Sequence, residues 1–247
     1  MAGIYQKMLE MVKARGAGYA VLLDPDKAPA AELAGQAAAI SRHVDLIFVG
    51  GSICVRNDFD QAVKAIKASS EAPVVIFPGD STQVSRHADA LLFLSLVSGR
   101  NPDLLIGEHV KAAPAIKRHG LEVIPVAYML VESGAMTSVQ FISQTLAIPR
   151  GKPEIAVAHA LAGEYLGMRL IFLEAGSGAE QHVPPEMVEA VSRQVSVPVV
   201  VGGGIRDPES AREIVRRGAS FIVTGDVIEK GGGIGLVREF ARAIHGE

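Results

Sequence analysis

The sequence contains no tryptophan, one cysteine and no uninterrupted apolar run long enough to cross a membrane. Because a spanning helix needs roughly 18 or more consecutive apolar residues, a transmembrane anchor is not expected. Lys7, Glu10 and Lys13 also interrupt the start of the chain, which argues against a signal peptide. The lone Cys54 rules out an internal disulfide and favours a reducing compartment. We therefore expect a cytoplasmic, soluble protein, which leaves room for transient contact with a membrane surface.

An excess of positive charge is also missing. The chain has 24 Lys and Arg residues against 27 Asp and Glu residues, giving a net charge of −3, and its basic residues are scattered. A nucleic-acid-binding surface would need a basic patch, so that class of partner is not expected. With 247 residues, 49% of them hydrophobic, the chain can bury one large core or two small ones.

Short apolar runs alternate with Ala-rich segments of helical character along the whole chain. The runs predict eight strands, at 19–23, 45–49, 73–77, 90–95, 121–127, 169–174, 198–201 and 220–224. The segments between them predict helices at 28–40, 58–70, 103–118, 153–166, 185–195 and 208–217, with a last helix near 234–245. Eight βα units predict a single-domain TIM (β/α)8 barrel over residues 1–247. An open doubly wound sheet is the rival fold.

Glycine-rich loops follow the last two predicted strands. VGGGIRD contains Gly203 and Gly204, and VTGD contains Gly225. At these positions of a barrel, glycines let backbone N–H groups approach a phosphate closely. The simpler interpretation is that they only make tight turns. A third loop after strand six, with Ser177 and Gly178, favours phosphate binding.

Glu174 ends the sixth predicted strand, in the stretch FLEAGSG. One interpretation is an inward carboxylate held by an Arg or Lys. Since the glycine-serine-glycine loop follows directly, we favour an acid that takes a proton from a hydroxyl of a bound polyol phosphate.

LLDPDK places Asp24 at the tip of the first predicted strand, and VGGS places Ser52 after the second. Oxygen ligands of this kind suit Mg²⁺, which usually takes one or two protein carboxylates together with substrate phosphate oxygens. Asp24 is equally well explained as a turn residue before Pro25. Lys27 is interpreted as a solvated surface lysine or a contact for diphosphate.

These motifs together, LLDPDK, VGGS, FLEAGSGA, VGGGIR and VTGDVIE, resemble those of the geranylgeranylglyceryl and heptaprenylglyceryl phosphate synthases, in order and over nearly the whole chain. The first loop and the length are more similar to the larger second subgroup. The resemblance implies an enzyme that joins sn-glycerol 1-phosphate to a polyprenyl diphosphate, with geranylgeranyl as the preferred chain. It also implies a homo-oligomer, either a dimer or a higher assembly built from dimers.

The resemblance also implies roles for individual residues. Asp24 and Ser52 would bind Mg²⁺, and Glu174 would orient or deprotonate the C3 hydroxyl of the glycerol. The substrate-binding set would be Phe172, Leu173, Glu174, Ala175, Gly176, Ser177, Gly178, Gly203, Gly204, Gly225 and Asp226.

Two positions depart from the family pattern. Phe172 stands where the family usually has Tyr, and Asp226 where it usually has Asn. The first removes a hydroxyl and the second adds a negative charge near the phosphate. The sequence therefore predicts weaker binding of glycerol phosphate than in relatives that keep Tyr and Asn.

Two other functions are open at this point. Phosphate-binding barrel isomerases or lyases share the glycine loops, but they would be expected to carry a second acid after strand five. Strand five is followed by no acid before Glu132. A catalytically silent ligand-binding barrel is the third possibility, and the joint presence of Asp24, Ser52 and Glu174 disfavours it.

Overall fold

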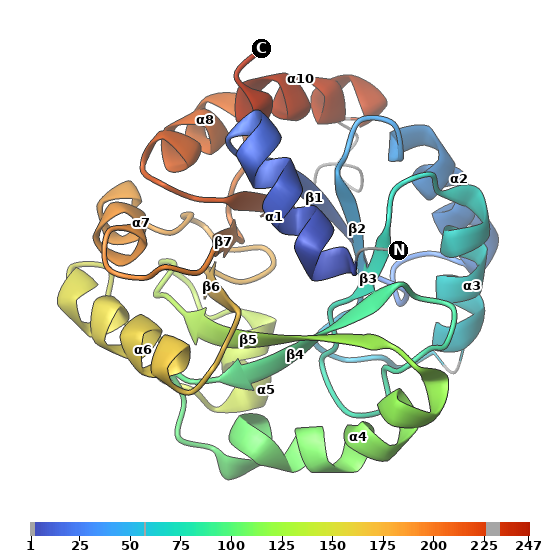
Figure 1. Cartoon of the computed structure of the whole chain (residues 1–247), viewed down its shortest axis with the longest axis horizontal. Coiled ribbons are helices and arrows are strands. Elements are labelled where there is room, and N and C mark those ends of the chain that lie inside the picture. Colours follow the sequence, from blue (N-terminus) through green and yellow to red (C-terminus); the bar gives the residue numbers. More distant parts are fainter. Residues whose placement is uncertain (1–2, 57, 226–232) are drawn as a thin grey trace.

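The computed structural model describes residues 3–56, 58–225 and 233–247. Eight strands form a closed barrel in which each strand pairs in parallel with the next and β8 pairs with β1 (Figure 1). The predicted (β/α)8 barrel is therefore confirmed. The strands are β1 (Gly18–Leu23), β2 (Leu46–Val49), β3 (Val74–Ile76), β4 (Ala90–Leu96), β5 (Glu122–Leu130), β6 (Leu170–Glu174), β7 (Val199–Gly202) and β8 (Phe221–Thr224).

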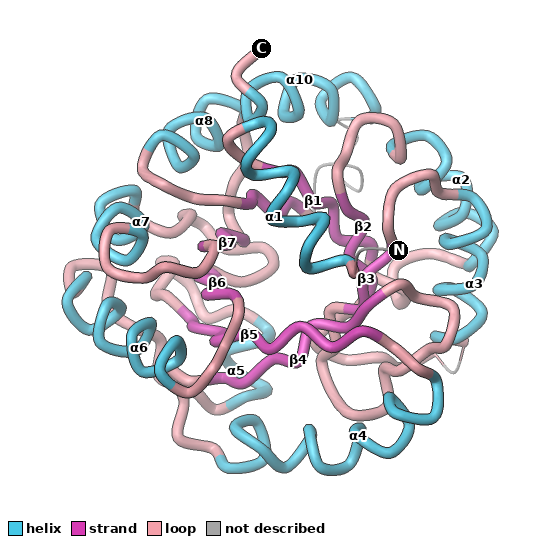
Figure 2. Tube along the Cα trace, in the orientation of Figure 1, coloured by secondary structure: helices cyan, strands magenta, loops and turns pink. Residues whose placement is uncertain are grey.

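Helices surround the strands as an outer ring (Figure 2). None of the helices within the described ranges is long and apolar enough to span a membrane. The ring consists of α2 (Ala30–Ile40), α3 (Phe59–Ser69), α4 (Glu108–His119), α6 (Pro153–Tyr165), α7 (Pro185–Ser192), α8 (Pro208–Arg216) and α10 (Gly233–His245), and the short α5 (Ser138–Ser143) follows β5.

The strands are apolar on both faces because each face meets a different apolar layer. Phe48, Phe172 and Phe221 point into the barrel and are fully buried there. Ile47 and Leu173, one residue along their strands, pack outward against the helices. Side chains alternate along a strand, so a strand covered on both sides reads as one continuous apolar run.

Helix α1 (Ile4–Arg15), which the sequence patterns did not predict, crosses one end of the barrel (Figure 1, blue). Its Tyr5 and Met8 are buried with the residues of the barrel interior. Glu122, the first residue of β5, accepts hydrogen bonds from the backbone N–H groups of Ile4 and Tyr5, the latter at 3.0 Å. The helix thus closes the N-terminal end of the strands and leaves the opposite end for a ligand.

The wall of the barrel is incomplete between β3 and β4. Their ladder has only the pairs Val75↔Ala90 and Ile76↔Leu91, whereas β4 continues beside β5 as far as Leu96↔Tyr128. Residues 77–89, which connect β3 to β4, contain no helix. The helix predicted at 103–118 begins as a π-helix, η1 (Asp103–Gly107), and continues as α4.

Candidate active site

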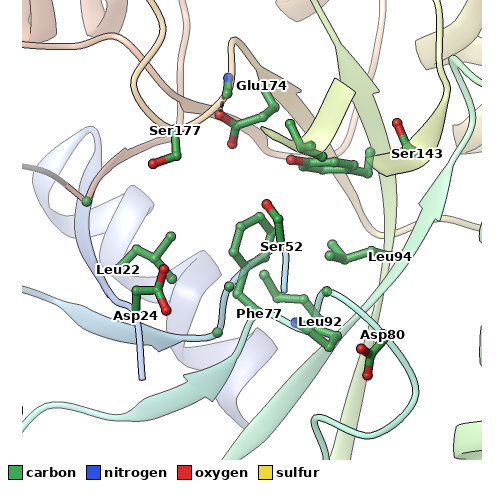
Figure 3. A pocket seen from close by; sticks show the side chains of 18 of the residues that line it. Leu22, Asp24, Ser52, Phe77, Asp80, Leu92, Leu94, Ser143, Glu174 and Ser177 are labelled. Carbon is green, nitrogen blue, oxygen red and sulfur yellow. Dashed lines mark hydrogen bonds between the residues drawn. The ribbon is translucent and has the colours of Figure 1, made fainter. Parts of the chain in front are cut away.

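A cavity of about 710 Å³ lies at the C-terminal ends of the strands. Figure 3 shows Glu174 and Ser177 on one side of it and Asp24 across from them, with Leu92 and Leu94 of β4 also lining it. The predicted site residues that line this cavity come from five different loops, and they are Asp24, Ser52, Glu174, Gly176, Ser177, Gly178, Gly203, Gly204 and Gly225.

Glu174 is the last residue of β6, and only 5% of its surface is exposed. Its Oε1 accepts a hydrogen bond of 2.6 Å from the backbone N–H of Gly176. Burial raises the pKa of this carboxyl to about 7, and the Gly176 N–H opposes the rise only in part. A carboxyl that titrates near neutral pH is well suited to accept a proton from a substrate hydroxyl. The predicted alternative, a salt bridge to an Arg or Lys, is absent among the described residues.

Gly203, directly after β7, cannot carry a side chain. Its φ is +80°, and a Cβ there would lie 2.4 Å from the Glu174 Oε1 and 2.5 Å from the Gly176 nitrogen. The β6 and β7 loops therefore touch through backbone at the place where the carboxylate sits. Glycine backbone therefore lines this side of the cavity, and a close approach of glycine backbone is typical of phosphate sites.

The opposite side of the cavity is acidic. Asp24 is half-buried, and its Oδ1 accepts a hydrogen bond of 3.0 Å from the backbone N–H of Asp26. Burial raises the pKa of the Asp24 carboxyl, while the Asp26 N–H and Lys27 lower it. Ser52 lines the same part of the cavity. Cys54 is nearby, and burial together with Asp26 raises the pKa of its thiol to about 11, so it is not a thiolate nucleophile at neutral pH.

A complete protein cage for a metal does not exist in the described residues, where no group of three or more His, Cys, Asp and Glu side chains converges. This fits Mg²⁺ better than it fits zinc, because Mg²⁺ keeps several waters and uses substrate phosphates as ligands. Asp24 and Ser52 both line the cavity, from the loops after β1 and β2 (Figure 3). The two residues supply hard oxygen donors of the right kind, so the residues present fit the ion.

The cavity continues through the incomplete wall between β3 and β4. Its lining includes Leu92 and Leu94 from the inner side of β4, and also Leu91 and Phe93 from the outer side. Beyond the strand it reaches the α4 residues His109, Ala112 and Ile116. We call this the wall slot. It is an apolar channel that runs from the centre of the barrel to the inner face of α4.

His109 is a polar residue of α4 that lines the wall slot, and its neighbour Glu108 also lines the cavity. Its Nε2 is 3.2 Å from the hydroxyl of Ser95, and its ring stands edge-on to Phe93 with the centroids 4.3 Å apart. Burial lowers the pKa of the imidazole, so the ring is neutral at physiological pH. A neutral ring preserves the apolar character of the channel.

Three predicted binding residues do not line the cavity. Phe172 is fully buried, stacked on Phe77 at 5.3 Å and edge-on to Tyr128 at 5.4 Å. Leu173 and Ala175 lie in the layer between strands and helices. For Leu173 and Ala175 the reason is the alternation of side chains along the strand: the residues on either side of an inward-pointing Glu174 must point outward. Asp226 lies outside the described residues.

Two cavity residues were not singled out as functional in the sequence. Arg206 lines the cavity beside Gly204 and donates a hydrogen bond of 2.9 Å to the carbonyl of Ala179. Its position in the sequence, directly after the GGGI of the predicted phosphate loop, could have identified it as a cavity residue. Tyr128 lines the cavity next to Glu174, and burial raises the pKa of its phenol well above the ordinary value. It is the register partner of Phe172 in the β5–β6 ladder.

Comparison with known proteins gives a consistent family. The sequence profile of the PcrB family matches residues 9–243 of this chain. A protein named geranylgeranylglyceryl phosphate synthase, from Chitinophaga pinensis, is 49% identical over 244 residues, which are 98% of this chain and 96% of that one. A protein of the same name from Thermococcus kodakarensis is 50% identical over 222 residues, covering 89% and 87%.

Solved structures agree. The (S)-3-O-geranylgeranylglyceryl phosphate synthase of Thermoplasma acidophilum, in complex with its substrate sn-glycerol-1-phosphate, superposes with a TM-score of 0.95 at 35% identity and covers 100% of both chains. Tryptophan synthase from Mycobacterium tuberculosis reaches a TM-score of 0.60 at 17% identity, covering 99% of both chains. The latter likeness concerns the fold alone.

Proposed function

The chain belongs to the PcrB family, and from this premise we propose that it joins sn-glycerol 1-phosphate to a polyprenyl diphosphate through an ether bond and releases diphosphate. The observation that carries the proposal is the division of one cavity into three parts. A backbone-lined end with a buried carboxyl suits a polyol phosphate, an acidic side suits a metal-bound diphosphate, and the apolar wall slot suits a prenyl chain.

The reaction assigns a clear task to Glu174. The C3 hydroxyl oxygen forms a bond to C1 of the prenyl chain, the bond from C1 to the diphosphate oxygen breaks, and its electron pair leaves with the diphosphate. The hydroxyl proton goes to the Glu174 carboxylate, which is the ionised form above a pKa of about 7. The glycine loops hold the phosphate so that the hydroxyl faces the reacting carbon.

Mg²⁺ is proposed as the cofactor. Asp24 and Ser52 would hold it, and when bound it would supply positive charge that stabilises the departing diphosphate. Lys27 also lines the cavity and adds a cation on the same side. In this proposal the positive charge of the metal would compensate the half-buried carboxylate of Asp24, which lies near Asp26.

The wall slot is proposed to hold a geranylgeranyl chain. An isoprenoid tail gains free energy of about 25 cal/mol for each Å² of apolar surface removed from water, so an apolar channel is the main source of its affinity. Leu92, Phe93 and Ile116 provide such surface along the slot.

Assembly and location are also proposed. Tyr165 and Leu166 at the end of α6, and Val110 on α4, are large apolar residues that are more than half exposed, which favours a homo-oligomer whose copies cover these faces. Phe141 and Leu146, near the cavity residue Ile142 in the chain, favour transient contact with a membrane surface that carries the prenyl substrate. Light scattering at several concentrations and vesicle flotation test the two statements. The proposed compartment is the cytoplasm.

The competing isomerase or lyase function lacks its second acid. β5 runs to Leu130, and the first acid after it, Glu132, is exposed and near the backbone of Arg150, at 3.5 Å. A silent binding barrel has no need for a buried carboxyl with a pKa near 7 at the phosphate end. Both alternatives predict no lipid product.

The test uses radiolabelled sn-glycerol 1-phosphate and a ladder of polyprenyl diphosphates, with Mg²⁺ or with EDTA. We expect organic-extractable label with Mg²⁺ only, and a maximum at the geranylgeranyl length. The enantiomer sn-glycerol 3-phosphate serves as the matched control and is expected to react much more slowly. The absence of product at every chain length would overturn the proposed prenyltransferase function. Product formation in EDTA would overturn only the proposed requirement for Mg²⁺.

A further inference from the structure

Gln83 is a fully buried polar residue in the connection between β3 and β4. Its carboxamide makes three hydrogen bonds, all to glycine backbone. The Nε2 donates to the carbonyl of Gly51 at 2.8 Å, and the Oε1 accepts from the N–H of Gly79 at 3.1 Å and, more weakly, from the N–H of Gly51 at 3.4 Å. It does not line the cavity.

The carboxamide occupies the place of a missing rung in the sheet. The β2–β3 ladder ends at Val49↔Ile76, after which the N–H of Phe77 still donates to the carbonyl of Val49. Gly51 and Gly79 lie just beyond that point, where their backbones are close together and are joined through Gln83, with no direct backbone hydrogen bond between these two described residues. Both backbone groups of Gly51 are paired by Gln83 instead of by a strand, so a side chain extends the ordered edge of β2.

Gly51 is where three loops meet. A Cβ on Gly51 would lie 2.8 Å from the Asp24 Oδ1, and a Cβ on Gly79 would lie 2.2 Å from the Gly51 carbonyl oxygen. The β1, β2 and β3 loops are therefore in contact through backbone and through the Asp24 carboxylate. A small shift of Gly51 moves Ser52, its neighbour in the chain, relative to Asp24.

We propose that Gln83 is a positioning residue for the diphosphate side of the cavity. By fixing Gly51 it fixes the separation of Asp24 and Ser52, and hence the binding of a metal-bound diphosphate, without touching either ligand. This inference rests on the proposed function. The glycerol phosphate side is built by the β6 and β7 loops, which Gln83 does not contact, so the effect is confined to one substrate.

Ser85 provides a matched control in the same loop. It is also fully buried and polar, and its hydroxyl donates a hydrogen bond of 2.7 Å to Asp60 on α3. Its contact ties the loop to an outer helix and not to the β2 loop. Loss of Ser85 therefore reports on loop stability alone.

The experiment compares Gln83→Met, which keeps the length of the side chain and removes the carboxamide, with Ser85→Ala. Calorimetric titration of inorganic diphosphate in Mg²⁺ gives binding without turnover, and steady-state kinetics give a separate KM for each substrate. We expect Gln83→Met to weaken diphosphate binding about tenfold and to raise the KM for prenyl diphosphate by a similar factor. The loss of hydrogen bonds to buried backbone groups changes an equilibrium constant by about this factor. The KM for glycerol phosphate should stay within about twofold.

Ser85→Ala should leave both KM values and diphosphate binding unchanged. The proposal fails if Gln83→Met binds diphosphate as the parent protein does, or if it raises both KM values equally. If Gln83→Met does not fold, Gln83→Asn, which keeps a carboxamide one methylene shorter, gives the same readout. A parent protein that makes no lipid product overturns the proposed function instead, and the calorimetric comparison still decides the role of Gln83.

Discussion

The two sides of the cavity are built by different means. The β6–β7 side uses backbone, with Gly203 packed against Gly176 and a single buried carboxyl, Glu174. The β1–β4 side uses side chains and a gap, with Asp24 and Ser52 beside a wall that β3 leaves incomplete. The first side is closely packed, whereas the second opens into an apolar channel.

This difference corresponds to the two proposed substrates. Glycerol phosphate is small and polar, so a rigid shell of backbone groups can enclose it. A prenyl diphosphate carries a long tail, and a closed barrel wall offers no room for one. Changes on the β6–β7 side are expected to act on glycerol phosphate and on the chemical step, while changes on the other side are expected to act on the diphosphate and the chain.

The largest effect is expected for Glu174→Gln, which removes the proposed base and keeps its shape. We expect kcat to fall by about 10²–10⁴, with little change in either KM. In the parent protein the rate should rise with pH to a plateau above about 7, because the carboxylate is the active form. Steady-state rates between pH 5 and 9 check both statements. An unchanged kcat for Glu174→Gln would sink the role of this residue.

The same substitution should stabilise the unliganded protein at high pH. The pKa of Glu174 is raised from 4.5 to about 7 on folding, so between these values the folded state binds more protons and stability falls as pH rises. Above pH 7 the cost is about 3 kcal/mol at most. Denaturant unfolding should find Glu174→Gln more stable than the parent at pH 8 and equal to it near pH 4.5. Parallel pH curves for the two proteins would contradict the buried, unpaired carboxyl.

Gly203→Ala tests the closely packed side. The new Cβ would collide with the Glu174 Oε1 and the Gly176 nitrogen at a positive φ. We expect the KM for glycerol phosphate to rise by a factor of about 10–100, because backbone strain and displacement there cost about 1–3 kcal/mol. Gly167→Ala is the control: its φ is +88°, nothing lies within 4 Å of its Cβ, and it does not line the cavity. A similar loss in both variants would mean that strain alone, and not the contact with Glu174, is responsible.

Ala112→Phe tests the wall slot. Ala112 is buried and faces the slot from α4. A phenyl ring there should raise the KM for geranylgeranyl diphosphate by about tenfold and spare shorter chains, since it fills apolar volume that only a long tail uses. Ala113→Phe, on the exposed neighbour, is the control. If all chain lengths were affected alike, the tail would not follow the slot.

The smallest effect is expected for Phe172→Tyr. The ring of Phe172 points into the barrel against Tyr128 and Phe77, below the Glu174 side of the cavity. A hydroxyl there is expected to lower the KM for glycerol phosphate by a few-fold. This is the effect of one additional hydrogen bond whose net free energy is at the low end of the usual range. An unchanged KM would indicate that Tyr128, its neighbour in the β5–β6 ladder, already supplies the hydroxyl.

The local sequence pattern was sufficient to predict the strands β6, β7 and β8 and the loops that follow them. Each of these strands is an apolar run, and the residues at its end, Glu174 and Gly203 among them, lie in the cavity. The order of strands in a barrel follows the order in the chain, so loops that are far apart along the chain could be grouped from the sequence alone. Leu173 and Ala175, which were also predicted to bind substrate, do not line the cavity, because a strand presents only every second side chain to one face.

Helices α1 and α5 were not predicted from the sequence. α1 is held by contacts from far along the chain, with Glu122 capping its first N–H groups. α5 has six residues, too few to give a periodic pattern. α5 is too short to be stable as an isolated helix, whereas α1 carries Ile4, Tyr5 and Met8 at helical spacing, a pattern that the prediction left out.

The sequence by itself therefore determined the barrel, the end of the barrel at which the cavity lies, and the chemical character of Asp24, Ser52, Glu174 and the glycine loops. Only the tertiary structure decided that β3 pairs with β4 over two positions, that the wall slot opens there, and that Gln83 completes the edge of β2. The physical reason is that apolar alternation reports how each segment is buried, whereas a gap in a wall and a buried hydrogen bond depend on which segments end beside one another.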